Sequence, residues 1–236
     1  MSQPYCGPAV PPEALWTAWN SDPLLLAGLG LLGLALWRWG RGPARWVAMA
    51  ALVLAFVSPL CALTVALLSG RALHHLVLAG VAAPALALAL PMAARLPAGI
   101  AAAGVSAAMV AWHLPAVYAA IWMSDGLYWL MQAALLLPAW AFWSAVLAPG
   151  ADARRLLGHA FLAVGLAGIM GLLGAILTFA PGPLYLQHVG GAALWGWSAL
   201  DDQQLAGLIL WVPGFLPMAG LAFALLRRGW RDGLAA

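Results

Sequence analysis

The chain has 236 residues, of which 65% are hydrophobic and only 7% are charged. A soluble domain of this length usually carries about a quarter charged residues, because its surface must be hydrated. The composition therefore excludes a soluble enzyme, a nucleic-acid binder and a disordered tail, and it indicates an integral membrane protein. All ten basic residues are arginines, and in a membrane protein they are read first as topology signals.

Hydrophobic runs along the chain predict the membrane spans. A bilayer core of about 30 Å takes roughly 20 apolar residues in a helix. Seven runs approach this length: 23–39, 46–68, 72–90, 99–122, 127–147, 156–180 and 205–226. We predict an all-α polytopic membrane protein, a bundle of seven transmembrane helices in one domain over residues 23–226. An external N-terminal tail, 1–22, and a cytoplasmic C-terminal tail, 227–236, flank it.

The arginines predict the orientation of this bundle. Nine lie in the first, third and fifth connections and the C-terminal tail: Arg38, Arg41, Arg45, Arg95, Arg154, Arg155, Arg227, Arg228 and Arg231. The opposite side holds Arg71 alone. Because cytoplasmic loops are enriched in basic residues, the N-terminus is predicted to lie outside and the C-terminus in the cytoplasm.

The two cysteines lie in different surroundings. Cys6 belongs to the polar N-terminal tail, whereas Cys61 lies within an apolar run and is typical of a small buried residue. This placement predicts no disulfide framework.

Polar side chains within membrane segments are costly and are usually kept for a purpose. On the predicted topology they gather in the external half, as Arg71, His74, His75, His113, Tyr128, Gln132, Asp201, Asp202, Gln203 and Gln204. Imidazole and carboxylate groups suit a transition metal such as copper or zinc. Adjacent helical residues point about 100° apart, so at most one of His74 and His75 can join His113.

The depth of each histidine in the membrane decides whether such a metal site can form. In continuous helices, His75 lies roughly 5 Å and His113 about 13 Å below the outer end. A shared site requires the fourth helix to end earlier, near Tyr118. The residues alone leave simpler alternatives open: His75 and His113 as interhelical hydrogen-bonding residues, His74 as an interfacial residue, and Arg71 as the partner of an external acid. Asp201 to Gln204 also has the pattern of a helix start, in which a carboxylate caps free N–H groups.

Four segments carry a resemblance to a known family. The most specific runs from Asp202-Gln203-Gln204 through Trp211-Val212-Pro213-Gly214. It resembles the hallmark of the CtaG-type cytochrome c oxidase assembly factors, a family of seven-span bacterial membrane proteins. Three others match in order: 73–78 with Ala83-Pro84, Trp112-His113-Leu114-Pro115 with Tyr118, and 127–132 with Phe142-Trp143. The resemblance covers roughly residues 20–226.

The resemblance implies a non-enzymatic, chaperone-like role in the respiratory chain, in the bacterial cytoplasmic (inner) membrane. The client is the catalytic subunit of a haem–copper oxidase, and copper is the implied cofactor or cargo. A periplasmic copper carrier is a further possible partner. The protein is also expected to contact membrane lipid and not to bind nucleic acid. The expected metal ligands are His75, His113 and His74, and the expected pocket residues are Asp202, Gln203, Gln204, Trp211, Arg71, Tyr128 and Gln132.

Two departures from the family pattern affect this expectation. Many members have a histidine where this chain has Arg71, and another where it has Tyr128. The chain is therefore expected to bind copper weakly, to use His74 instead, or to act as a docking scaffold for the oxidase subunit. The alternative functions are a haem-binding membrane redox protein and a small membrane transporter. The depth difference between His75 and His113, and the lack of an internal repeat, weigh against these two.

Overall fold

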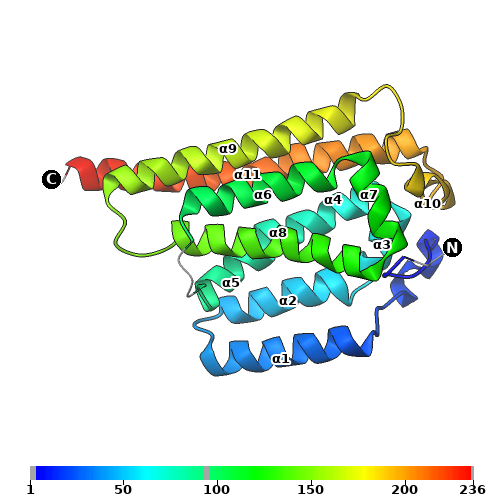
Figure 1. Cartoon of the computed structure of the whole chain (residues 1–236), viewed down its shortest axis with the longest axis horizontal. Coiled ribbons are helices and arrows are strands. Elements are labelled where there is room, and N and C mark those ends of the chain that lie inside the picture. Colours follow the sequence, from blue (N-terminus) through cyan, green and yellow to red (C-terminus); the bar gives the residue numbers. More distant parts are fainter. Residues whose placement is uncertain (1–3, 93–95, 235–236) are drawn as a thin grey trace.

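The computed structural model describes residues 4–92 and 96–234. Every regular element in these ranges is a helix, so the all-α prediction is confirmed (Figure 1). The long helices lie side by side, and the N- and C-termini lie at opposite ends of the bundle. The elements are η1 (Pro12–Thr17), α1 (Pro23–Trp39), α2 (Ala44–Phe56), α3 (Leu60–Ala66), α4 (Leu68–Leu76), η2 (Val77–Ala82), α5 (Ala83–Ala89), α6 (Ala98–Trp112), α7 (Pro115–Ala120), η3 (Ile121–Met123), α8 (Asp125–Val146), α9 (Ala153–Phe179), η4 (Leu186–His188), α10 (Val189–Leu194) and α11 (Ala199–Leu234).

Four helical stretches are long and apolar enough to cross a membrane: Leu68–Ala89, Asp125–Val146, Ala153–Phe179 and Ala199–Arg231. Two bent helix pairs, α2 with α3 and α6 with α7, raise the number to six if each pair is one span. Helix α1 is apolar but has only 17 residues. The protein is therefore a multi-pass membrane protein with four to six candidate spans, while the seventh span and the orientation remain predictions. Of the residues on which the orientation depends, Arg95 lies outside the described ranges.

Two of the expected continuous runs are broken. The second run bends by 41° between α2 and α3, next to Pro59, and the fourth bends by 77° between α6 and α7, next to Pro115. Proline has no N–H to donate, and it disfavours the helical conformation in the residue before it. The second bend places His113 at the C-terminal end of α6 instead of in the middle of a straight helix.

The stretch Leu68–Ala89 keeps its direction in spite of Pro84. The turn before this proline widens into the π-helix η2, in which each N–H would bond five residues back. Pro84 cannot donate to the carbonyl of Ala79, and the indole N–H of Trp143 on α8 donates to that oxygen at 3.0 Å. The proline therefore leaves no unsatisfied carbonyl at this point.

Helices α9 and α11 form the most extensive helix pair of the bundle (Figure 1). A Cβ atom on Gly174 would lie 2.7 Å from the carbonyl oxygen of Gly207 and 2.9 Å from Cβ of Trp211. The two backbones therefore approach as closely as glycine allows, which is how helices in lipid gain packing energy.

The N-terminal tail is folded against the bundle. Contrary to the sequence prediction, Cys6 and Cys61 form a disulfide. The break between α2 and α3 places Cys61 in the first turn of α3, at the end of the bundle where the tail folds back (Figure 1). Tyr5 stacks on Tyr128 with 4.8 Å between ring centroids, and Trp195 donates to the carbonyl of Val10 at 2.9 Å.

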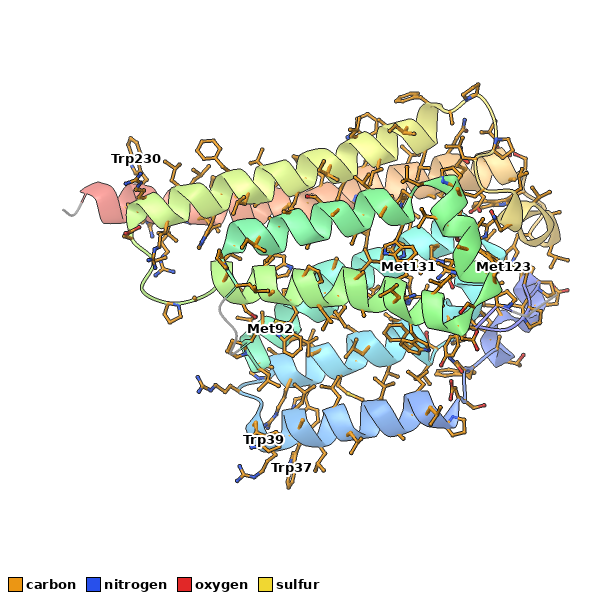
Figure 2. All side chains as sticks on the ribbon, in the orientation of Figure 1. Trp37, Trp39, Met92, Met123, Met131 and Trp230 are labelled. Carbon is orange, nitrogen blue, oxygen red and sulfur yellow. A yellow bond between two sulfur atoms is a disulfide. The ribbon has the colours of Figure 1, made fainter. Side chains whose placement is uncertain are left out.

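The opposite end of the bundle carries outward-facing aromatic rings. Trp37 and Trp39 on α1 and Trp230 on α11 are exposed and project away from the helices there (Figure 2). Tryptophans are enriched at membrane–water interfaces. Helix α11 continues past residue 226 to Leu234, so the described part of the predicted C-terminal tail extends the last helix.

Candidate functional site

A small cavity lies between α4, α6, α7, α9 and α11, at the end of the bundle that carries the N-terminal tail. Its volume is about 10 Å³, room for one water-sized guest. Arg71 and His75 of α4, His113 at the end of α6, Tyr118 of α7 and Tyr185 line it together with apolar side chains. The site therefore collects three of the residues that the sequence singled out.

His75 and His113 face each other across this cavity. Their ring centroids lie 5.9 Å apart, a separation that one ion bridging two imidazole nitrogens at about 2 Å each could span. The bend at Pro115 removes the expected difference in depth, because α6 ends at His113. His75 is 3% exposed and neither of its ring nitrogens has a hydrogen-bond partner among the described residues. A buried polar group without a partner in a membrane protein indicates a functional role.

The other histidine has a fixed orientation. His113 Nδ1 lies 2.6 Å from the carbonyl oxygen of Met109, one helical turn earlier. Because a carbonyl only accepts, Nδ1 carries the proton and the neutral ring presents its lone pair at Nε2. Metal-ligating histidines are commonly oriented by such a bond from the second nitrogen.

His74 lies apart from this pair. Its ring contacts Phe56 of α2 edge-on at 5.3 Å, and its centroid is 6.1 Å from that of His75. His74 is fully buried, whereas an interfacial position was one of the expectations. Since His74 does not line the cavity, the arrangement brings His75 and His113 together without it.

Arg71 lies one turn before His75 and is 4% exposed. Its Nε and Nη1 have no hydrogen-bond partner, and within the described ranges no ion pair joins it to an acid. Its guanidinium carbon instead lies 6.0 Å from the ring centroid of Tyr118 and 5.7 Å from that of Tyr128. The expected pairing of Arg71 with an external acid is therefore not observed, and two aromatic faces surround the cation.

The predicted fifth-span residues lie under the N-terminal tail. Tyr128 is 3% exposed, beneath Tyr5, and its hydroxyl is 3.5 Å from Sγ of Cys6. Arg71 and Tyr128 line a second cavity of about 10 Å³ together with Pro4, Tyr5 and Cys6. Gln132 follows one turn later on α8, is buried, and its amide interacts with the hydroxyl of Tyr128.

Asp202 and Gln203 connect helices instead of lining the cavity. The carboxylate of Asp202 accepts from the backbone N–H of Leu68 at 2.6 Å, and from the N–H and hydroxyl of Ser69 at 3.1 and 2.5 Å. It therefore caps α4 and not its own helix, whose start is closed by Ser198 paired with Asp201 at 2.6 Å. The predicted helix start is therefore present and includes Asp201, whereas Asp202 caps another helix.

Gln203 holds the connection between α9 and α10. Its side-chain oxygen accepts from the N–H of Leu184 at 2.6 Å, and its amide donates to the carbonyls of Leu177 and Gly182 at 3.3 and 3.4 Å. Gln204 is only partly buried, and Trp211 packs edge-on against Phe179 with 6.1 Å between ring centroids. Neither residue contributes to the wall of the cavity.

Three aromatic residues of the site were missing from the sequence-predicted set: Tyr118, Tyr185 and His188. The Tyr118 hydroxyl lies 2.7 Å from Nε2 of His188, and the Tyr185 hydroxyl donates to the carbonyl of His113 at 2.6 Å. Burial lowers the pKa of His188 to about 3, and the nearby Arg71 cation acts in the same direction. His188 is therefore neutral at physiological pH. The one signal in the sequence that could have identified His188 is its position in the polar connection between the sixth and seventh predicted spans.

The donor set fits a loosely held metal ion and not a closed metal centre. No group of three His, Cys, Asp or Glu side chains in the described part of the chain is arranged to hold a metal. His75 and His113 supply two nitrogen donors, and imidazole suits copper. Two donors fit an ion in transit, while a resident structural ion usually has four ligands.

Comparison with known proteins identifies the family. The family model described as cytochrome c oxidase caa3 assembly factor matches residues 96–232, more than half of the chain. No curated protein and no solved structure matches the chain. The match includes α6 with His113 and the Asp202-Gln203-Gln204 segment, and because it begins at residue 96 it does not include α4. The chain belongs to the cytochrome c oxidase caa3 assembly factor family.

Proposed function

We propose that this protein assists maturation of a haem–copper cytochrome c oxidase by presenting a copper ion, held between His75 and His113, to the catalytic subunit. The observation that carries the proposal is the facing pair of imidazoles, 5.9 Å apart, with the Nε2 lone pair of His113 available. Family membership supports a non-catalytic role and an interaction with the oxidase.

The incomplete donor set supports delivery over storage. Two imidazoles leave coordination positions open, so a client side chain can join the ion before the carrier releases it. Arg71 lies one turn before His75, and its positive charge weakens cation binding there. We therefore propose weak, transient copper binding, with a periplasmic copper carrier as the donor.

The cavity argues against the haem alternative. Haem held between two histidines needs a pocket for the whole macrocycle, whereas the space between His75 and His113 is about 10 Å³. A transporter would be expected to open a path along the bundle. The cavity lined by His75 and His113 instead lies where α6 ends and α7 begins, and α7 lies at the end of the bundle that carries the N-terminal tail (Figure 1).

The proposed delivery requires seven spans and an external site in the bacterial cytoplasmic membrane. A reporter fused after Ala236 is expected to be active only in the cytoplasm. Activity of that reporter on the external side would overturn the orientation and, with it, delivery to the outer face.

Oxidase maturation in cells tests the function. In a strain lacking the protein, His75→Ala and His113→Ala are expected to restore little oxidase activity while accumulating normally in the membrane. His74→Ala is the matched control, because this neighbouring buried imidazole lies outside the cavity and should restore activity. Full oxidase activity in each of the two single variants, His75→Ala and His113→Ala, would contradict the assignment of the site.

A further inference from the structure

We propose that Arg71 forms a binding site for one small monovalent anion of halide size. The side chain is 4% exposed, yet its Nε and Nη1 donate to no group in the described ranges. An uncompensated guanidinium in a low-dielectric interior carries a large desolvation cost, and such groups are normally paired. An anion bound at either of these N–H groups would provide the missing charge.

The surrounding side chains do not supply that charge. Asp202 uses both carboxylate oxygens on the first turn of α4. Asp22 accepts from Tyr5 at 2.6 Å and from the N–H of Leu24 at 2.8 Å. Tyr118 and Tyr128 offer their ring faces, and the Tyr118 hydroxyl also interacts with Arg71, but both groups are neutral and leave its charge uncompensated.

The space beside Arg71 limits the size of the ligand. Arg71 lines both the cavity toward His75 and the cavity beneath Tyr5 and Cys6, and each has a volume of about 10 Å³. That volume holds one water-sized species. Chloride and bromide fit this limit, whereas sulfate and gluconate do not. Water alone would satisfy the N–H groups but would leave the charge of Arg71 uncompensated.

The anion site stands independently of copper, because its evidence is the unpaired cation and not the histidine pair. It would also reduce the repulsion between Arg71 and any cation at His75. Direct binding is the test, on the detergent-solubilised full chain without copper. Equilibrium dialysis with radiolabelled chloride is expected to show about one saturable chloride per chain, displaced by bromide and not by gluconate.

The variants locate that site. Arg71→Gln is expected to lose at least nine tenths of the bound chloride, while the exposed Arg154→Gln should retain it. Anomalous X-ray diffraction from wild-type crystals soaked in bromide needs no variant. It should show a bromide peak at hydrogen-bond distance from Arg71 Nε or Nη1. No saturable chloride in the wild type, equal binding by folded Arg71→Gln, or bromide sites only elsewhere would each overturn the proposal.

Discussion

Asp202 caps helix α4 from 133 residues away, by accepting hydrogen bonds from both the backbone N–H and the hydroxyl of Ser69. Helix α4 has no side-chain cap of its own, and its first turn follows directly on α3. The carboxylate also complements the positive end of the helix dipole. A residue of the most specific family segment thereby fixes the helix that carries Arg71 and His75.

Removing this cap should destabilise the protein. Asp202→Ala is expected to cost about 1–3 kcal/mol, because it leaves the N–H groups of Leu68 and Ser69 unsatisfied in a buried place. Thermal unfolding in detergent measures the loss. Asp201→Ala is the matched control, since this exposed neighbour bonds only the local Ser198. Equal unfolding temperatures for the two variants would contradict the role of Asp202.

The disulfide should stabilise the folded tail. Cys6 and Cys61 are 55 residues apart, and the chain-entropy model gives about 4 kcal/mol for a closed loop of this length. The double variant Cys6→Ser with Cys61→Ser is expected to unfold at a lower temperature than the wild type. Reductant should lower the unfolding temperature of the wild type only. Two reactive thiols in the denatured, unreduced wild-type protein would show that the bond is absent.

Acid should destabilise the site through His188. Its pKa is lowered to about 3 in the folded state, against about 6.5 when unfolded. Between these values only the unfolded chain binds the proton, so stability rises with pH and falls as pH drops below 6.5. The loss from pH 7 to pH 5 is expected to be about 2 kcal/mol. His188→Gln should unfold with a shallower pH dependence, and an unchanged dependence would contradict the assignment.

Two glycines of α9 form a matched pair for testing the contact between α9 and α11. Gly174→Ala would place a methyl group 2.7 Å from the carbonyl oxygen of Gly207, so it should destabilise the protein by about 1–3 kcal/mol. Gly168 has open space at the corresponding position, and Gly168→Ala should be neutral or slightly stabilising. Comparison of the two unfolding temperatures checks the contact, and a similar effect of both substitutions would argue against it.

Hydropathy and motif resemblance predicted the helical class, the family and three residues that line the cavity, Arg71, His75 and His113, but not how those residues meet. If the fourth helix were straight, His113 and His75 would lie at different depths in the membrane. The sequence could not decide that Pro115 ends α6 there, because other prolines, such as Pro213 and Pro217, remain inside α11. Periodicity describes one helix at a time, whereas this site depends on where two helices end.

Long-range connections were also beyond the sequence. Asp201 and Asp202 both belong to the predicted helix start, but only Asp201 takes part in it, and the partners of Asp202 lie on α4. Cys61 lies in an apolar run, and only the break after α2 brings it to the tail that carries Cys6. Both differences have the same cause. The packing of distant segments decides the hydrogen-bond and covalent partners of these residues, and composition does not reveal that packing.

Copper binding by the purified protein tests the central proposal most directly. The detergent-solubilised chain is equilibrated with Cu(I) by dialysis under reducing, anaerobic conditions, and bound copper is measured at increasing free Cu(I) beside His75→Ala, His113→Ala and His74→Ala. We predict about one copper per wild-type chain at saturation, loss of that copper in His75→Ala and in His113→Ala, and retention in His74→Ala. No copper in any folded variant, or equal copper in all four proteins, would contradict a site between His75 and His113.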